Sequence, residues 1–151
     1  CKGSGTNVDA MECCFKKCPR NGMDVGEDAT VTATRCDFME NGPHGVFCWH
    51  HTKVRLNDCT MHHNRLDGLY AYDHAIVDLH GPKTDIHSNK GYGIDADENA
   101  KFNIHLPAQH ITSRDNVEAD RYQIDGGSIA NVNADGTFTH VVAVDLDEDD
   151  Y

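Results

Sequence analysis

The sequence feature that most constrains the fold is a phrase that recurs at a spacing of 23 residues. Residues 31–45 read Val-Thr-Ala-Thr-Arg-Cys-Asp-Phe-Met-Glu-Asn-Gly-Pro-His-Gly, and residues 54–68 read Val-Arg-Leu-Asn-Asp-Cys-Thr-Met-His-His-Asn-Arg-Leu-Asp-Gly. The same spacing continues backwards to Val8 and, after two extra residues near Gly81, forwards to Gly93. A repeat of this length indicates structural units that stack along one axis.

The apolar residues of each repeat form columns when the repeats are aligned. They alternate with polar residues, which is the period of a β-strand and not of a helix. Three such stretches, separated by turns, fit into each repeat, so the pattern predicts an all-β parallel solenoid of about five coils. The columns are Val8, Val31, Val54, Val77 and Phe102; Ala10, Ala33, Leu56, Leu79 and Ile104; Phe15, Phe38, Met61 and Ile86; Met23, Val46, Leu69 and Ile94; and Val25, Cys48, Ala71 and Ala96.

Two further columns mark the turns. One contains asparagine, which tolerates the left-handed backbone of a sharp turn and whose side chain can bond to neighbouring coils. Four residues later comes a glycine column, for which we also expect positive φ. The columns are Asn41, Asn64 and Asn89, and Gly22, Gly45, Gly68 and Gly93.

The regularity decays in the last third of the chain, where an offset of 25 residues places residues 117–118 on residues 92–93. A length of 151 residues corresponds to one domain. We expect residues 1–7 to be a lead-in or a truncated coil, residues 8–142 to form the solenoid with a degenerate C-terminal end, and residues 143–151 to be an acidic tail.

The charge balance limits the classes of partner. The chain has 13 basic and 25 acidic residues and a net charge of −12, which disfavours nucleic acid and anionic membranes. No apolar run approaches the roughly 20 residues of a membrane span. Metal ions, cationic ligands and neutral polymers suit such a chain better. Because the sequence begins at Cys1, its start does not indicate a compartment.

Seven cysteines at first suggest a disulfide framework. However, Cys13, Cys36 and Cys59 share one column, which favours reduced thiols buried as small apolar side chains. Cys14 and Cys18 are close enough in sequence to pair or react, but there is no second cysteine pair of the kind that holds structural zinc.

The alternating strands and the Asn and Gly columns resemble the right-handed parallel β-helix of the pectate-lyase-like superfamily, over roughly residues 8–132. Residues 104–110 and 126–140 further resemble uncharacterised β-helix repeat proteins of unicellular marine algae. The superfamily resemblance implies binding to, or action on, acidic polysaccharides, often with Ca²⁺. The lyases' calcium triad and catalytic arginine have no residue-by-residue match here, and fold alone does not carry function.

The outward positions after the glycine column place four aromatic residues near one another. Coils stack about 4.8 Å apart, and strand residues two apart lie about 6.6 Å apart. These rings are therefore expected to form one exposed aromatic patch. Three interpretations stay open: a sugar-binding face, a protein interface, or rings simply covered by a loop or by cross-coil stacking. The rings are Phe47, Trp49, Tyr70 and Tyr72, and the bordering acids include Asp24, Asp73, Asp95, Asp97 and Glu98.

The same face carries the candidate catalytic carboxylates. Glycosidases need two carboxyl groups about 5–5.5 Å or about 6.5–9.5 Å apart. Asp73 with Glu98, or Asp95 with Asp97, meets this requirement by strand geometry, as any acidic ladder would.

Metal candidates come from the histidines. His51 and His74 share a column with Asp28, and two stacked histidines can hold a divalent ion if a third ligand joins them. His62 and His87 share another column. We expect no organic cofactor; the one ligand of this kind that the sequence leaves open is Ca²⁺ or another divalent cation.

Together, these observations favour a non-catalytic binding or scaffold module. Its outer aromatic and acidic face would dock a protein partner in a larger assembly, or a polysaccharide. The alternative is a carbohydrate-active enzyme, a lyase or hydrolase, that uses Asp73, Asp95, Asp97 or Glu98.

Overall fold

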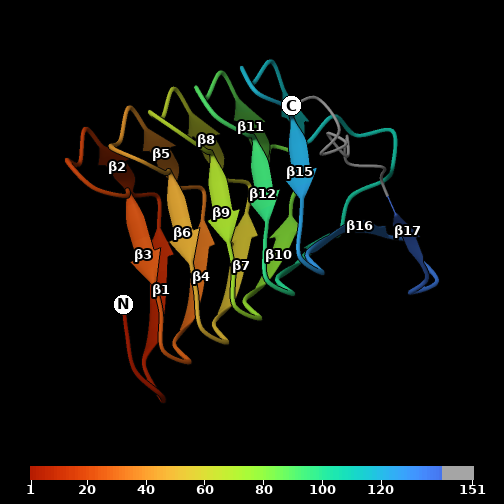
Figure 1. Cartoon of the computed structure of the whole chain (residues 1–151), viewed down its shortest axis with the longest axis horizontal. Coiled ribbons are helices and arrows are strands. Elements are labelled where there is room, and N and C mark those ends of the chain that lie inside the picture. The colour runs from red at the N-terminus through yellow and green to blue at the C-terminus, as the bar shows by residue number, and fades with distance from the viewer. Residues whose placement is uncertain (141–151) are drawn as a thin grey trace, which may run out of the picture.

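The computed structural model describes residues 1–140, which fold into stacked coils of short strands (Figure 1). Each of the first five coils contributes one strand to each of three parallel sheets, and no helix occurs in the described part of the chain. The predicted all-β parallel solenoid is therefore confirmed. Within residues 1–140 there is accordingly no helix with the length and apolar character that a membrane crossing requires.

The three sheets take their strands from the coils in chain order. The first sheet contains β1 (Asn7–Met11), β4 (Thr30–Thr34), β7 (Lys53–Asn57), β10 (Ile76–His80), β13 (Lys101–Ile104), β16 (Ser128–Val132) and β17 (Phe138–His140). The second contains β2 (Cys14–Lys16), β5 (Asp37–Met39), β8 (Thr60–His62), β11 (Asp85–His87) and β14 (Ser113–Arg114). The third contains β3 (Met23–Val25), β6 (Val46–Cys48), β9 (Leu69–Ala71), β12 (Ile94–Ala96) and β15 (Arg121–Gln123).

The strand register reproduces the predicted apolar columns. Val31 pairs with Val8 on one side and with Val54 on the other, and Phe38 pairs in the same way with Phe15 and Met61. The inward residues of the second to fourth coils are buried, whereas the first coil packs less completely, so Val8 and Phe15 are only partly buried. Cys36, Cys48 and Cys59 are buried free thiols in this core, but the predicted burial is wrong for Cys13. Cys13 is exposed, like Cys1 and Cys14, because the strands that flank it, β1 and β2, are edge strands of their sheets.

The asparagine column forms a hydrogen-bond ladder, as predicted, but its backbone is not left-handed. The Asn41 N–H donates to Asn64 Oδ1 at 3.1 Å, and the Asn64 N–H donates to Asn89 Oδ1 at 3.1 Å. Asn116 adds a step that the sequence alignment missed, because its Oδ1 accepts from the Asn89 N–H at 3.0 Å. Positive φ belongs instead to the residue before each ladder position, such as His63 at 56°. The side-chain amide, and not its tolerance of left-handed backbone, accounts for asparagine here.

The expected positive φ of the glycine column is also wrong. Gly22, Gly45, Gly68 and Gly93 are not among the left-handed residues. A Cβ on Gly45 would lie 2.7 Å from Gly68 O and 2.9 Å from Asn64 Nδ2. Glycine is required here because the next coil passes too close for a side chain.

The fifth coil is longer than predicted. Ile94 pairs with Arg121, and the Gly93 N–H donates to Ala119 O at 2.9 Å, so the offset is 27 residues and not 25. Residues 119–120, and not 117–118, therefore correspond to residues 92–93. The stack ends with β17, which pairs antiparallel with β16. Residues 141–142 of the predicted solenoid and the predicted acidic tail lie outside the described residues.

Candidate functional site

A left-handed corner after each strand of the third sheet positions several of the candidate residues. Two consecutive residues of each coil have positive φ there, for example His50 at 53° and His51 at 58°, then Asp73 at 51° and His74 at 62° in the next coil. A buried small residue follows each pair and anchors the turn: Ala29, Thr52, Ala75 and Ala100. Each coil therefore places two side chains at the same corner. Equivalent side chains of successive coils form two columns, with a spacing of about 4.8 Å along each column.

The structure brings three of the four predicted rings into contact on the outer side of β6 and β9. The ring centroids of Phe47 and Tyr70 are 5.4 Å apart, those of Tyr70 and Tyr72 are 5.7 Å apart, and those of Phe47 and Tyr72 are 5.6 Å apart. His44 joins them, 5.1 Å from the Tyr70 ring. All four side chains are half-buried. We call His44, Phe47, Tyr70 and Tyr72 the aromatic face.

Trp49 is half-buried at the border of the aromatic face and makes separate contacts. Its indole lies over Gly26 of the preceding coil, where an added Cβ would clash with the ring. Its Nε1 donates to Asp24 Oδ1 at 3.0 Å, and Lys2 Nζ lies 4.7 Å from the ring centroid. The neighbouring coil and a cation therefore already engage this ring.

Two of the predicted carboxylates, Asp95 and Asp97, lie beside the aromatic face. Tyr70 OH donates to Asp97 Oδ2 at 3.3 Å. Asp95 pairs with Tyr70 in the strand register, and its Oδ1 is buried with no hydrogen-bond partner among residues 1–140. Burial raises the pKa of Asp95 to about 7, and the charges of Asp67 and Asp97 add to the shift. Carboxyl groups with strongly raised pKa values are frequent at functional sites.

Asp73 and Glu98 lie at the left-handed corner and not on the face. Asp73 Oδ2 is 2.8 Å from His50 Nδ1, and Asp73 Oδ1 is 3.2 Å from His74 Nδ1. The hydrogen bond to His50 lowers the pKa of the Asp73 carboxyl, and the same bond raises the pKa of His50. The four predicted carboxylates are thus divided between two places.

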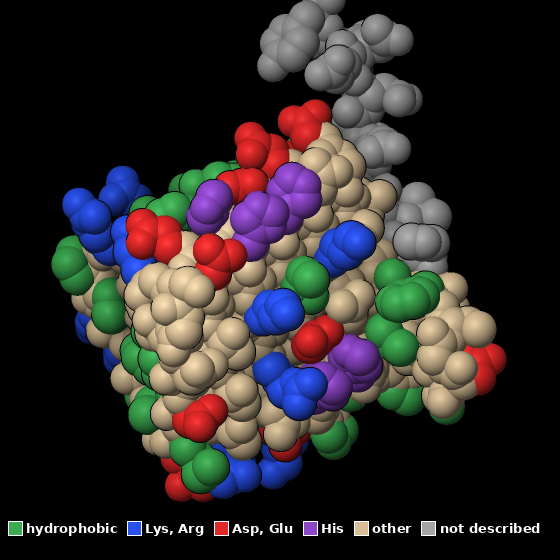
Figure 2. Space-filling model, turned by 90° about the horizontal axis from the view of Figure 1, so that it is seen from below, with side chains coloured by type: hydrophobic (Ala, Val, Ile, Leu, Met, Phe, Trp, Pro, Cys, Tyr) green, Lys and Arg blue, Asp and Glu red, His purple; other side chains and the backbone are tan. Residues whose placement is uncertain are grey.

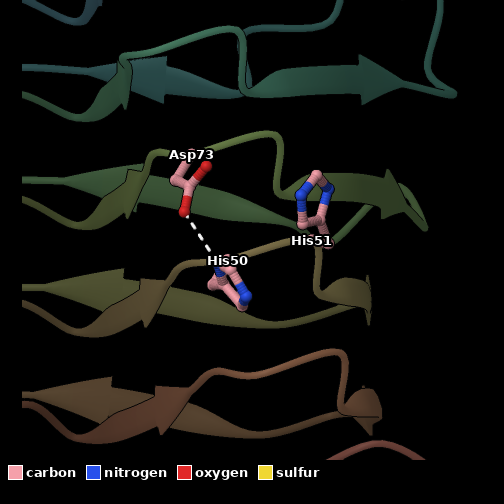
Figure 3. A group of neighbouring side chains, drawn as sticks. All are labelled: His50, His51 and Asp73. Carbon is pink, nitrogen blue, oxygen red and sulfur yellow. Dashed lines mark hydrogen bonds and ion pairs between the residues drawn. The ribbon is translucent and has the colours of Figure 1, made fainter.

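The corner also gathers possible metal ligands (Figure 3). One ligand atom from each of His50, His51 and Asp73 lies within 4.8 Å of the others. His51 and His74, which share a predicted column, stack with centroids 5.0 Å apart. The cluster takes its carboxylate from Asp73 of the following coil and not from the predicted Asp28.

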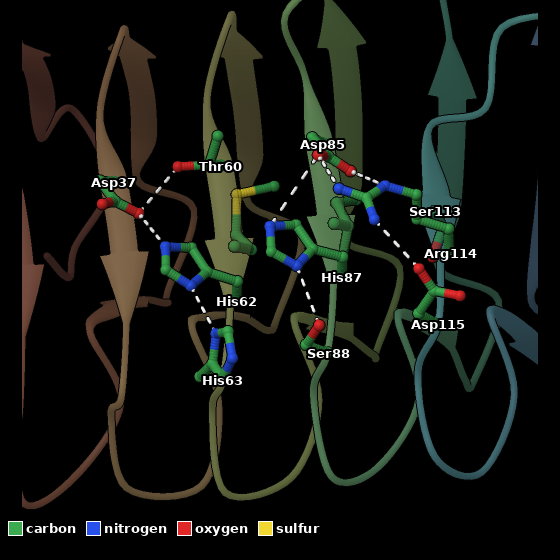
Figure 4. Close-up of polar contacts among 12 residues, drawn as sticks. Asp37, Thr60, His62, His63, Asp85, His87, Ser88, Ser113, Arg114 and Asp115 are labelled. Carbon is green, nitrogen blue, oxygen red and sulfur yellow. Dashed lines mark hydrogen bonds and ion pairs between the residues drawn. The ribbon is translucent and has the colours of Figure 1, made fainter.

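A second histidine ladder crosses the outer side of the second sheet (Figure 4). His62 and His87 stack at 5.0 Å, and His62 Nε2 lies 3.1 Å from Asp37 Oδ1. Arg114 Nη2 lies 2.7 Å from Asp85 Oδ2, so both acids of this ladder already have side-chain partners, His62 for Asp37 and Arg114 for Asp85. Histidine and acidic side chains also gather beside each other on the face shown in Figure 2.

Sequence reasoning missed three members of these clusters. His44 and Asp67 belong to turns and not to strands, so the alternation pattern gave no direction for their side chains; in the structure His44 Nδ1 lies 3.0 Å from Asp67 Oδ2. His50 stands directly below Asp73 in the repeat alignment, a signal that column-by-column comparison of histidines overlooked.

The stacked parallel coils, the asparagine ladder and the buried columns define a parallel β-solenoid. The family model of the right-handed β-helix region matches residues 2–138, so the chain belongs to the right-handed β-helix family. No curated protein and no solved structure gives a significant match. The resemblance to algal β-helix proteins stays a prediction.

Proposed function

We propose that the chain is a non-catalytic binding module that holds an uncharged glycan on the aromatic face. The observation that carries this proposal is the continuous contact of Phe47, Tyr70 and Tyr72 beside two carboxylates, Asp95 and Asp97. Ligand sites typically combine apolar and aromatic surface with a few placed polar groups.

The chemistry of the face favours a sugar over a protein partner. Sugar rings offer C–H groups to aromatic side chains and hydroxyls to carboxylate acceptors, and charge-assisted hydrogen bonds are the stronger ones. Protein interfaces, in contrast, are depleted of Asp and Glu at their cores. The net charge of −12 would repel polysaccharides that carry carboxylates, so an uncharged glycan fits best.

Calorimetric titration with neutral and acidic oligosaccharides tests the proposal. We expect saturable binding of one neutral class and no binding of uronate oligomers. Tyr72→Ala removes one ring of the aromatic face, and a ring contact of about 0.5–1.5 kcal/mol corresponds to a roughly two- to tenfold loss of affinity.

Phe138→Ala is the matched control, because Phe138 is an exposed ring on β17 of the first sheet. This variant should bind the glycan as the parent chain does. Failure of every neutral glycan to bind would reject the proposal. If Tyr72→Ala instead abolished the binding of a purified protein partner, the face would be a protein interface.

A hydrolase is the second candidate, favoured by the raised pKa of Asp95. A carboxyl group with a pKa of about 7 can donate a proton near neutral pH, and Asp97 lies two residues further along the chain. Strand positions two apart are separated by about 6.6 Å, within the range of inverting glycosidases. Release of new reducing ends from the bound glycan, abolished by Asp95→Asn, would replace the non-catalytic proposal with this one.

A further inference from the structure

The histidines and acid of the left-handed corner carry an inference that is independent of the aromatic face. His50 and His51 come from one coil and Asp73 from the next, and one ligand atom of each lies within 4.8 Å of the others (Figure 3). We propose that these three residues bind a divalent transition-metal ion of the zinc class, which joins the second and third coils.

The ligand set defines the class of metal. Two imidazole nitrogens and one carboxylate oxygen suit Zn²⁺ and related first-row ions, whereas Ca²⁺ and Mg²⁺ prefer oxygen alone. His50 Nδ1 and Asp73 Oδ2 are 2.8 Å apart and share a hydrogen. A metal with bonds of about 2.0–2.2 Å takes the place of that hydrogen after a small separation of the two groups. The exposed His51 ring then turns towards it, and water completes the coordination.

The surroundings favour a cation at this corner. Glu27 and Asp28 precede the histidines by one coil, and their negative charges act on His50. Glu98 follows Asp73 in the same column. The histidines are exposed, so an ion reaches them from solvent without any opening of the core.

His74 positions the cluster from the side. Its ring stacks on His51 with centroids 5.0 Å apart, and its Nδ1 lies 3.2 Å from Asp73 Oδ1. Contacts of this kind fix the orientation of a metal ligand, and their loss commonly lowers metal affinity by about 10–100-fold. His74 is therefore a positioning residue, and its loss should weaken metal binding less than loss of a direct ligand.

Zinc titration of the 151-residue chain tests the site, with the exposed thiols of Cys1, Cys13 and Cys14 alkylated beforehand because thiolates are themselves zinc ligands. We expect saturable calorimetric binding of one Zn²⁺, a melting temperature that rises by several degrees, and a visible absorption band when Co²⁺ is used. Ca²⁺ should produce none of these.

The test variants are His51→Asn and Asp73→Asn. Asparagine tolerates the positive φ of both positions, so the corner keeps its backbone while the metal ligand is lost. Each variant should lower the Zn²⁺ affinity at least about tenfold and keep the melting temperature of the parent chain in EDTA.

His63→Asn is the matched control. His63 also has positive φ and is exposed, and its Nδ1 lies 2.7 Å from His62 Nδ1, but this pair is not part of the three-ligand cluster. Its affinity for Zn²⁺ should equal that of the parent chain. Equal Zn²⁺ affinity of the parent chain, His51→Asn and Asp73→Asn, or no saturable binding at all, would overturn the proposal.

Discussion

At the residue scale, Asp95 is the group whose environment departs most from that of a surface carboxylate. It occupies an outward position of β12, yet its Oδ1 is buried and has no hydrogen-bond partner in the described part of the chain. Burying a carboxylate without such partners disfavours its charged form, and the nearby Asp67 and Asp97 act in the same direction. The folded state therefore tolerates protonated Asp95 better than ionised Asp95.

This environment predicts that Asp95→Asn raises the free energy of unfolding by an amount that depends on pH. The folded pKa of about 7 lies above the unfolded value of about 3.8, so the folded state binds more protons between these values, and stability falls as pH rises through that window. Asparagine cannot ionise and escapes this loss. We expect the variant to match the parent chain near pH 4 and to be more stable by about 1–4 kcal/mol at pH 8. Urea unfolding at several pH values measures the difference, and a gain that is constant with pH would contradict the argument.

The repeat predicts the column of a residue but not the direction of a long side chain. Trp49 and Tyr72 share a column, yet the Trp49 indole lies over the backbone of Gly26 in its preceding coil, whereas the Tyr72 ring lies against the Phe47 ring of its own preceding coil. In the same way, Asp73 contacts His50 in its own column and also the adjacent His74. The left-handed corner brings the column of His50 and Asp73 close to the column of His51 and His74. A linear alignment treats these as separate columns and does not predict the contacts between them.

At the scale of the elements, the sequence correctly predicted where the strands and turns lie, but not why asparagine and glycine occur in the turns. The three-strand coils and their inward faces follow from alternation and the 23-residue period, because a shift of one residue would expose every apolar side chain. The asparagine and glycine columns were also placed correctly. Positive φ was the wrong reason for both, since close approach and side-chain bonding select the same residue types as left-handed backbone. Asn116 was missed because two more residues lengthen the fifth coil.

The asparagine ladder predicts that Asn64→Ala is strongly destabilising. The buried Asn64 side chain accepts from the Asn41 N–H and donates to Phe38 O and to Asn89 Oδ1. Alanine leaves these buried groups without their partner, at about 1–3 kcal/mol for each unsatisfied group. We expect a loss of roughly 2–4 kcal/mol in urea unfolding.

Asn103→Ala provides the comparison for this prediction, because Asn103 is a partly exposed strand residue whose amide donates to Asp78 Oδ1 at 2.9 Å. Water can replace that bond, so the loss should stay below about 1 kcal/mol. Similar losses for the two variants would mean that the ladder has no special role in holding the coils together.

At the scale of the whole molecule, the solenoid is stabilised by contacts between neighbouring coils, and its two ends differ. β1, β2 and β3 each pair with only one strand, as β14 and β15 do at the other end, but in the first coil the inward residues Val8, Ala10 and Phe15 of β1 and β2 are partly exposed. The middle coils are enclosed on both sides. In such a stack, stability is nearly a sum of coil and interface terms, so opening should begin at the first coil and proceed inward.

The cysteines can report the order in which the coils open, since they lie in successive coils. Alkylation requires a thiolate that solvent reaches, so Cys13 and Cys14 of the exposed first coil should react at once. Cys36 and Cys59 occupy equivalent positions of the second and third coils, and both are buried. Burial also raises the pKa of the Cys59 thiol to about 11. Each therefore reacts only when its coil opens, and Cys36 should react before Cys59 because its coil lies nearer the less enclosed end.

Timed labelling of the 151-residue chain with iodoacetamide, followed by peptide mass spectrometry, measures this order. With opening free energies of about 4 kcal/mol or more, labelling of Cys36 should be slower than that of Cys13 by about a thousandfold, and Cys59 slower again. In denaturant all thiols should react at similar rates, which removes intrinsic reactivity as the cause. Equal protection of Cys36 and Cys59 would show instead that the coils open together, as one cooperative unit, and not coil by coil from the first.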